Sequence, residues 1–337
     1  MNREIAVQSR WDAMRVAMFA VAGGILGMLG SWALQAQSFP SKPIRLVVPY
    51  SAGSGTDIAS RIAAEGMSDI LKQPVLVENR EGAGGEVGTQ AVARAPADGY
   101  TIVSTTNSYL INSVLYHKPL YDALRDLTPL ARQSYNPLAL LVGGDSQFKT
   151  FKQLIDYMKA NPGKVSFATS GKGAQSQLEV EYIKGVFGGL KAEDIPYKST
   201  ASATADTMTG VVAFYMTGFA TTFPQIAAGK LRALAVGSQS READAPEVPT
   251  FIEVTGVQGY LPAAWFGYAA PIATPPEIVA ILEGALLRTL NGPVAREKIL
   301  KQKSKPWVQG SREFGADLRI EYDKWSKLIN ELNLKTD

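Results

Sequence analysis

The chain of 337 residues is 46% hydrophobic and 19% charged, enough for one large or two medium-sized globular domains with buried cores. It has no cysteine, which excludes disulfides, thiolate nucleophiles, iron–sulfur clusters and cysteine zinc sites. The 34 basic and 31 acidic residues form no dense basic run, which argues against a nucleic-acid surface. His117 is the single histidine and is given no role, and the sequence predicts neither a metal nor a cofactor.

The N-terminus has the layout of a secretory signal. Three arginines precede the largely apolar stretch "VAMFAVAGGILGMLGSWAL", and small and polar residues follow it. Residues 1–38 are therefore predicted to be a signal peptide, cleaved after Ser38 or, as the near alternative, after Ala36. A single membrane anchor is the other interpretation, because 19 residues can span a bilayer. The glycines within the stretch favour cleavage and an exported protein.

After the signal, short β-rich apolar runs alternate with segments of helical periodicity. Strands are predicted at 44–50, 74–80 and 100–106, with helices at 58–71 and 86–95 between them. This rhythm is typical of a parallel sheet with right-handed crossovers. Asp57 and Arg61 are spaced to pair one turn apart on the first helix.

A second series of the same kind predicts a second α/β lobe. Its strands and helices are expected within 139–144, 151–160, 164–170, 175–188, 194–198, 211–217 and 231–238. The C-terminal part predicts a strand at 265–271, a helix at 275–290 and a last amphipathic helix. Its apolar residues, expected to be core that docks on the first lobe, are Phe314, Leu318, Tyr322, Trp325, Leu328 and Ile329. The predicted lobes are therefore 39–139 with 260–337, and 140–259, with crossings near Pro137 and Tyr260 and a cleft between them.

The turn "SAGSGTD", residues 51–57, joins the first strand to the first helix. Its small residues leave the backbone N–H groups of Ala52 to Thr56 uncovered at a helix N-terminus, where a carboxylate is held without a basic side chain. Ser51, Ser54 and Thr56 add hydroxyl groups. A plain N-cap by Ser54 or Thr56, with nothing bound, is the alternative.

Two related glycine-rich patterns are incomplete. No Gly-Lys-Ser/Thr closes the turn at 51–57, and Ile58 stands where the last glycine of a dinucleotide fingerprint belongs. A second turn, "TSGKGAQSQ" at 169–177, opens a helix of the second lobe. Two such turns facing each other would clamp a small anion.

Several blocks along the chain carry a family resemblance. They are "PSKPIRLVVPY", "TDIASR", "VENREGAGGEVG", "ADGYTI", "IPYK", "GKLRALAV" and "APEVPTFIEVTG". In this order they resemble the periplasmic solute receptors of tripartite tricarboxylate transporters, often called Bug proteins, from about Phe39 to the C-terminus. Blocks such as "ENREGAGG" and "LRALAV" are interpreted as turns and core strands that specify the fold.

The resemblance implies an α/β fold of two lobes, a type II-like Venus flytrap with a mainly parallel sheet in each lobe. Such a receptor closes on a small organic carboxylate and passes it to membrane permease subunits. It implies a periplasmic location, and we expect a monomer. The expected ligand-binding residues come from both turns and nearby strand ends, and are Tyr50, Ser51, Ala52, Gly53, Ser54, Gly55, Thr56, Asp57, Asn107, Ser170, Gly171, Gly173, Gln175, Tyr197, Ser199 and Thr217.

Departures from the family pattern bear on the ligand. Ala213 and Thr217 stand where acids are common, which removes partners for a ligand ammonium. We therefore expect a carboxylate with an apolar or aromatic body, such as an aromatic dicarboxylate of the terephthalate type, in preference to citrate or an amino acid. Its walls are expected among Tyr50, Tyr109, Tyr197, Phe214 and Met216, with Phe214 the one most expected in the core.

Two other functions stay open. An exported hydrolase-like enzyme on the same fold lacks a cysteine, a Gly-x-Ser-x-Gly motif and more than one histidine, so that only carboxylate pairs remain for acid–base chemistry. A ligand sensor for a membrane kinase would use the same site as a transport receptor.

Overall fold

The computed structural model describes residues 39–169, 174–197 and 199–335. The fold presented here is that of the unit that begins at Lys42. The predicted signal peptide lies outside the described residues. Within them no single helix is long and apolar enough to cross a membrane, and only α10 and α11, bent by 68° against each other, pass that test as a pair.

The first lobe opens with the predicted βαβ rhythm. Its strands β1 and β2 are parallel, as are β1 and β3, and helices connect them. The elements are β1 (Ile44–Val48), α2 (Gly55–Leu71), β2 (Val75–Asn79), η1 (Ala83–Gly85), α3 (Glu86–Ala93) and β3 (Thr101–Thr105). The apolar runs predicted as strands are therefore confirmed.

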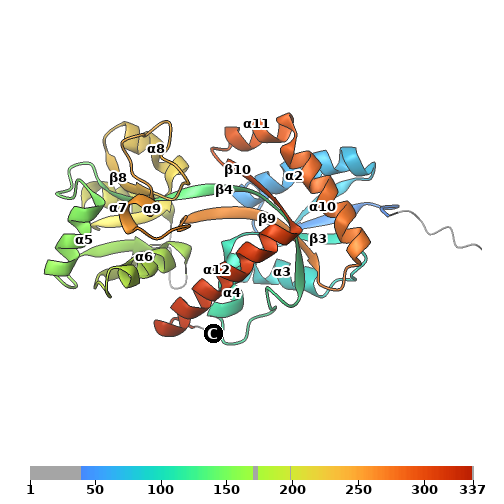
Figure 1. Cartoon of the computed structure of the whole chain (residues 1–337), viewed down its shortest axis with the longest axis horizontal. Helices are drawn as coiled ribbons and strands as arrows, with labels where there is room; N and C mark the ends of the chain where they lie inside the picture. The colour runs from blue at the N-terminus through green and yellow to red at the C-terminus, as the bar shows by residue number, and fades with distance from the viewer. Residues whose placement is uncertain (1–38, 170–173, 198, 336–337) are drawn as a thin grey trace, which may run out of the picture. The chain divides into compact units, whose positions relative to one another are not determined.

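Later segments of the chain complete this sheet. The order is β2-β1-β3-β9-β4, with β10 also paired to β4, and the pairings of β9, β4 and β10 are antiparallel (Figure 1). The added elements are α4 (Asn107–Leu115), β4 (Leu127–Gly143), β9 (Ala263–Pro271), α10 (Pro276–Asn291), α11 (Pro293–Lys301), β10 (Lys305–Gly310) and α12 (Ser311–Glu331). The sheet is consequently mixed.

A second sheet uses the other half of β4. It has the order β8-β4-β7-β5-β6, in which β5 is parallel to both of its neighbours and β4 is antiparallel to β7 and β8. Its elements are α5 (Phe151–Ala160), β5 (Ser166–Thr169), α6 (Gln175–Val186), β6 (Glu193–Pro196), α7 (Thr200–Thr209), β7 (Phe214–Gly218), α8 (Phe219–Ala227), β8 (Leu231–Val236) and α9 (Phe251–Thr255). The two-lobe α/β fold is confirmed. The expected mainly parallel sheet in each lobe is not found, because β4 crosses both sheets and its pairings are antiparallel.

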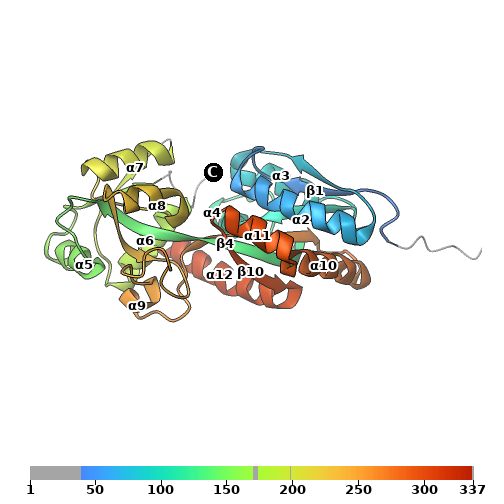
Figure 2. The same cartoon turned by 90° about the horizontal axis from the view of Figure 1, so that it is seen from above.

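Strand β4 belongs to both sheets. Pro137 still pairs with Ala263 of β9, whereas the next residue, Leu138, pairs with Gly218 of β7. Figure 2 shows this 17-residue strand running through the molecule. The partner change lies close to one predicted crossing, while the lobe boundaries at 139/140 and 259/260 stay a proposal.

Each sheet has its own hydrophobic core. In the first, the aromatic and aliphatic face of α12 is buried against α4 and β4, as the sequence predicted, with Trp265 edge-on to Phe314 at 5.2 Å between ring centres. In the second, Phe167, Phe214 and Phe251 lie in one cluster with α5. The two clusters meet at α6, because Leu178 belongs to the first cluster and Tyr182 packs against both.

Candidate functional site

The turn at 51–57 connects β1 to α2, as predicted. Helix α2 begins at Gly55, and the Ser54 side chain accepts the N–H of Asp57 at 3.2 Å. Ser54 is therefore an N-cap, which satisfies one of the helix's unpaired donors. The N–H of Ser54 also closes the turn by donating to the carbonyl of Ser51 at 3.2 Å.

Three backbone donors of the turn remain for a ligand. The N–H of Gly53 donates to Asp57 Oδ2 at 2.9 Å and is not one of them. Within the described residues, the N–H groups of Ala52, Gly55 and Thr56 have no acceptor. They stand at the N-terminus of α2, where the partial positive charge of the helix favours an anion.

Asp57 holds the turn in place. Its carboxylate is 2% exposed and accepts from the N–H of Gly53, from Arg61 Nε at 2.9 Å and from Asn79 Nδ2 at 3.0 Å. Burial alone would raise the pKa of Asp57, but the hydrogen bonds from Arg61, Gly53 and Asn79 outweigh it, so the pKa lies below its usual value. Both oxygens are thus occupied, and the predicted pairing with Arg61 is confirmed.

Tyr50 and Ser51 contact residues that the sequence analysis did not select. The Tyr50 hydroxyl lies 3.0 Å from Thr106 Oγ1, and its carbonyl accepts from Asn79 Nδ2 at 3.0 Å. The Ser51 hydroxyl donates to Glu81 Oε2 at 2.5 Å. Glu81 therefore places a carboxylate at the turn, from within the block "ENREGAGG" that was interpreted as fold-specifying.

Asn107 lies at the start of α4 and connects this helix to β9. It is 5% exposed, and its Oδ1 accepts the backbone N–H of Trp265 at 2.9 Å. It lines a cavity of about 540 Å³ together with residues of α6 and α12. This hydrogen bond fixes the start of α4 to β9. The Oδ1 of Asn107 is therefore already used within the protein and is not a free acceptor for a ligand.

A small polar cavity lies against the helix start. It has a volume of about 50 Å³ and is lined by Gly55, Ser134, Asn136 and Phe266, among others. Ser134 Oγ and Asn136 Oδ1 are buried and have no hydrogen-bond partner in the part of the chain that the structure describes. A β-carbon at Gly55 would lie 3.4 Å from the Phe266 ring, an ordinary van der Waals contact, so α2 starts in direct contact with β9.

Predicted residues of the second lobe converge on the same stretch of β4 and β9. Gln175, the first residue of α6, donates from Nε2 to the carbonyl of Ala263 at 2.8 Å. Thr217 of β7 pairs with Ala139, two residues beyond Pro137, the partner of Ala263. Gln175 and Thr217 therefore lie where β4 passes from one sheet to the other.

Tyr197 and Ser199 lie beside the second turn's strand. The N–H of Tyr197 donates to the carbonyl of Thr169 at 2.8 Å, and its hydroxyl donates to Asp206 at 2.7 Å. That hydrogen bond is the main reason why the pKa of Tyr197 is raised. Ser199 caps α7 and is exposed. Ser170, Gly171 and Gly173 lie outside the described residues.

Asp194 is a further residue that the sequence analysis missed. It lies on β6, and its carboxylate accepts from Thr169 Oγ1 at 2.6 Å and from Gln177 Nε2. These two residues bracket the second predicted turn, at the end of β5 and in the first turn of α6. Its two partners lie 25 and 17 residues away in the sequence, so no local sequence pattern indicates this contact.

The described residues contain no group of three histidine, aspartate or glutamate side chains placed to hold a metal ion. His117 is exposed. The donors that the structure brings together are backbone amides, hydroxyls and side-chain amides, a set suited to hydrogen bonding of a carboxylate.

Comparisons with known proteins point to one family. The model of the family described as "Tripartite tricarboxylate transporter family receptor" matches residues 59–334. The chain is 32% identical over 321 residues to protein BugT of Bordetella pertussis, covering 94% of this chain and 98% of that one. The solved periplasmic binding protein BugD is similar with a TM-score of 0.69 and 31% identity, over 89% of this chain and 100% of that one. Rpa4515 of R. palustris, solved with adipate, has a TM-score of 0.70 and 29% identity, over 87% and 97%.

Proposed function

The chain belongs to the family of tripartite tricarboxylate transporter receptors, and from this premise we propose that it captures a small organic carboxylate between its lobes and delivers it to the permease of such a transporter. Members of this family are periplasmic solute-binding receptors. The observation that carries the proposal is the set of N–H groups of Ala52, Gly55 and Thr56, which have no acceptor within the described residues.

The first turn binds one carboxylate through these amides. Two of them lie in the first turn of α2, so the helix dipole and the donors act on the same oxygens. The nearby negative charge of Asp57 is offset by the Arg61 guanidinium, whose Nε lies 2.9 Å from it. The turn therefore attracts an anion although no basic side chain contacts it.

A second carboxylate of the ligand is bound by the other lobe. The proposed contacts are the turn at 170–173, Gln175, Tyr197, Ser199 and Thr217. Gln175 and Thr217 support this assignment because they lie at the stretch of β4 and β9 that also forms the polar cavity beside Gly55.

Ligand binding closes the lobes by rotation at the crossings near Pro137 and Tyr260. A rotation of two rigid lobes about a few backbone torsions is the usual response of such a fold to its ligand. Small-angle scattering with and without saturating ligand tests this closure. An unchanged radius of gyration at saturation argues against it.

The structure narrows the residues that wall the ligand. Tyr109, Phe214 and Met216 are core residues, each 3% exposed or less, which confirms the expectation for Phe214 and corrects it for the other two. Tyr50 and Tyr197 are half-buried and keep the proposed role, with their hydroxyl groups fixed by Thr106 and Asp206. Their rings support a dicarboxylate with an apolar or aromatic body.

Calorimetry with adipate, terephthalate, citrate and glutamate identifies the ligand class. Adipate, present in the R. palustris relative, is a dicarboxylate with an apolar body. We expect terephthalate or adipate to bind most tightly. Tight binding of glutamate with none of terephthalate contradicts this choice and points to Glu81 as the partner of a ligand ammonium, while leaving the receptor assignment intact.

Ser54→Glu and Ser54→Ala form a matched pair that tests the site. Both lose the N-cap, which costs about 1 kcal/mol of stability, but only glutamate adds a negative charge beside the amides. Repulsion at a few ångströms amounts to about 4 kcal/mol at an effective dielectric of 20, so Ser54→Glu is expected to abolish binding and Ser54→Ala to retain it. Equal binding by both variants removes the turn from the site.

The same titrations separate a receptor from an enzyme. A receptor is stabilised in thermal unfolding by RT ln(1 + [L]/Kd) and returns its ligand unchanged. Chromatography that shows conversion of the bound carboxylate supports the hydrolase-like alternative. A sensor for a membrane kinase would give the receptor result and differs only in its partner.

A further inference from the structure

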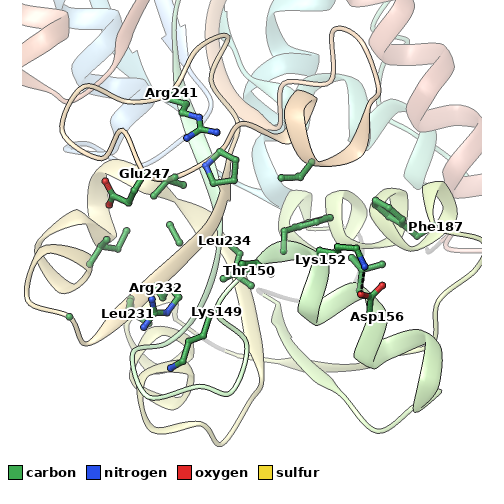
Figure 3. A pocket seen from close by; sticks show the side chains of 18 of the residues that line it. Lys149, Thr150, Lys152, Asp156, Phe187, Leu231, Arg232, Leu234, Arg241 and Glu247 are labelled. Carbon is green, nitrogen blue, oxygen red and sulfur yellow. Dashed lines mark hydrogen bonds and ion pairs between the residues drawn. The ribbon is translucent and has the colours of Figure 1, made fainter.

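A large open groove lies on the second lobe, outside the proposed ligand site. Its volume is about 940 Å³, and its walls are α5, the strand β8 and the segment 241–249 (Figure 3). None of the predicted ligand residues lines it. The groove therefore needs an explanation of its own.

The groove runs along an edge of the second sheet. Strand β8 pairs with β4 on one side. At its C-terminal end the other edge is already bridged, because Val236 pairs with Thr250 and its N–H donates to the carbonyl of Pro249. Within the described residues, the stretch 231–234 of that edge has no backbone hydrogen bond to a segment other than β4.

The carbonyl of Lys230 accepts from the N–H of Gly144 beside β4. Because backbone N–H and C=O groups of successive strand residues point alternately to the two edges, the N–H groups of Leu231 and Ala233 point away from β4 and toward the groove. An open strand edge of this kind is a template for a further strand.

Apolar walls flank this edge on both sides. Phe151 and Ile155 of α5 line one side, and Ile226 and Val248 line the other. Phe151, Ile155 and Val248 are mostly buried in the lobe and present only an edge to the groove, whereas Ile226 is half-buried. Helix α5 packs in the core on one face of the sheet, whereas Ile226 and Val248 belong to the cluster on the opposite face. A strand added beside β8 would direct alternate side chains toward these two walls.

The rim of the groove is positively charged. Lys152 is paired with Asp156 and Arg241 with Glu253. Of the remaining charged lining residues, Lys149, Lys159 and Arg232 have no carboxylate partner in the described part of the chain, against one unpaired acid, Glu247. Figure 3 labels Lys149 and Arg232 among the residues that line the groove.

We propose that β8 receives an extended, acidic segment of another protein as an added strand in this groove. The backbone edge supplies hydrogen bonds, the apolar walls receive alternate side chains, and the unpaired cations select acidic residues. A second copy of this chain fits less well, because pairing two β8 edges would bring two basic rims together. The proposal does not depend on the ligand site.

Two synthetic heptapeptides test the charge preference. The acidic probe has three central valines flanked by two glutamates at each end, and the basic probe replaces these glutamates with lysines. We expect the acidic probe to bind, with affinity that falls as salt is added, and the basic probe to bind at least about tenfold more weakly. Absence of acidic-probe binding at about 1 mM, where ~4 kcal/mol would be detected, or equal affinity of the two probes, overturns the proposal.

A matched pair of charge reversals locates the site. Lys149 is exposed on the rim, and Lys164 is exposed on the same lobe but does not line the groove. Lys149→Glu is expected to weaken acidic-probe binding about fivefold, equivalent to ~1 kcal/mol, and Lys164→Glu to leave it nearly unchanged. Equal effects of the two reversals overturn the assignment to this groove.

Amide hydrogen exchange distinguishes strand addition from side-chain docking. In the complex with the acidic probe, the N–H groups of Leu231 and Ala233 should exchange more slowly than in the free protein. Binding that leaves their exchange unchanged overturns the added strand. Sedimentation that shows a dimer of this chain competing with the probe assigns the edge to a second copy and overturns the acidic partner.

Discussion

The two predicted turns are both supported by a buried or half-buried carboxylate, but they obtain it differently. In the first lobe, Asp57 lies on the helix that the turn opens and binds the turn's own backbone at Gly53. In the second lobe, Asp194 lies on the neighbouring strand β6 and binds the side chains of Thr169 and Gln177 on either side of the turn. One support is local in sequence, and the other depends on strand pairing.

The electrostatic settings of these two carboxylates also differ. Asp57 has a cation, Arg61, one helical turn away, and is 2% exposed. Asp194 is half-buried, and within the described residues no cation pairs with it. We infer that Asp57 holds the first turn in place, and that this turn presents its amides before the ligand arrives.

The largest expected effect follows from removing Asp57. Asp57→Ala removes the acceptor of the Gly53 N–H and of Arg61 Nε and one of the two acceptors of the Asn79 amide, which should cost about 2–3 kcal/mol of unfolding free energy and most of the ligand affinity. Chemical denaturation and calorimetry measure the two losses. Arg61→Ala is the control: its side chain is 55% exposed, so a loss below about 1 kcal/mol is expected. Equal losses would mean that the ion pair matters more than the turn.

A smaller effect is expected from Asp194. Asp194→Ala releases the side-chain donors of Thr169 and Gln177, so about 1–2 kcal/mol of stability should be lost, with weaker ligand binding. Denaturation of Glu193→Ala, an exposed neighbour on β6, provides the baseline. If Asp194→Ala proves more damaging than Asp57→Ala, the local support by Asp57 is not the stronger of the two.

Acid should act on the first turn through Asp57. Its pKa is lowered in the folded state, so the unfolded chain binds the proton more readily and the stability from Asp57 is present at neutral pH. That stability is lost as the pH falls below the ordinary aspartate value of about 3.9 and through the folded pKa. Unfolding free energies at a series of pH values should fall more steeply for the wild type than for Asp57→Asn, and parallel curves contradict the assignment.

The smallest effect concerns Glu81, which has no equivalent described at the second turn. Glu81→Gln removes a negative charge that accepts from Ser51, so adipate should bind about threefold more tightly, an effect that salt weakens. Asp69→Asn makes the same charge change at the exposed far end of α2 and should have no effect. Weaker adipate binding by Glu81→Gln would show that Glu81 supports the site through Ser51.

Local signals accounted for much of the fold. The βαβ rhythm, the apolar face of α12 and the Asp57–Arg61 pair depend on residues within one or two turns of each other, and the structure confirms them. The first half of β4 was missed because Pro129, Arg132 and Gln133 interrupt its apolar pattern. Arg132 is buried there because Asp317 and Glu321 of α12 pair with it at 3.0 and 3.3 Å.

The sequence by itself therefore determined many of the elements, the family and the turn that opens α2, because periodicity, capping and motif order act over short stretches of chain. It did not indicate α4, α7, α11 or β10. Only the tertiary structure decided which donors of that turn stay available, since Gly53 loses its N–H to Asp57 while Ala52, Gly55 and Thr56 keep theirs. It also placed Glu81, Asn79 and Asp194 at the turns and left one edge of β8 open. These features depend on partners far apart in the sequence, and only the folded sheets bring them together.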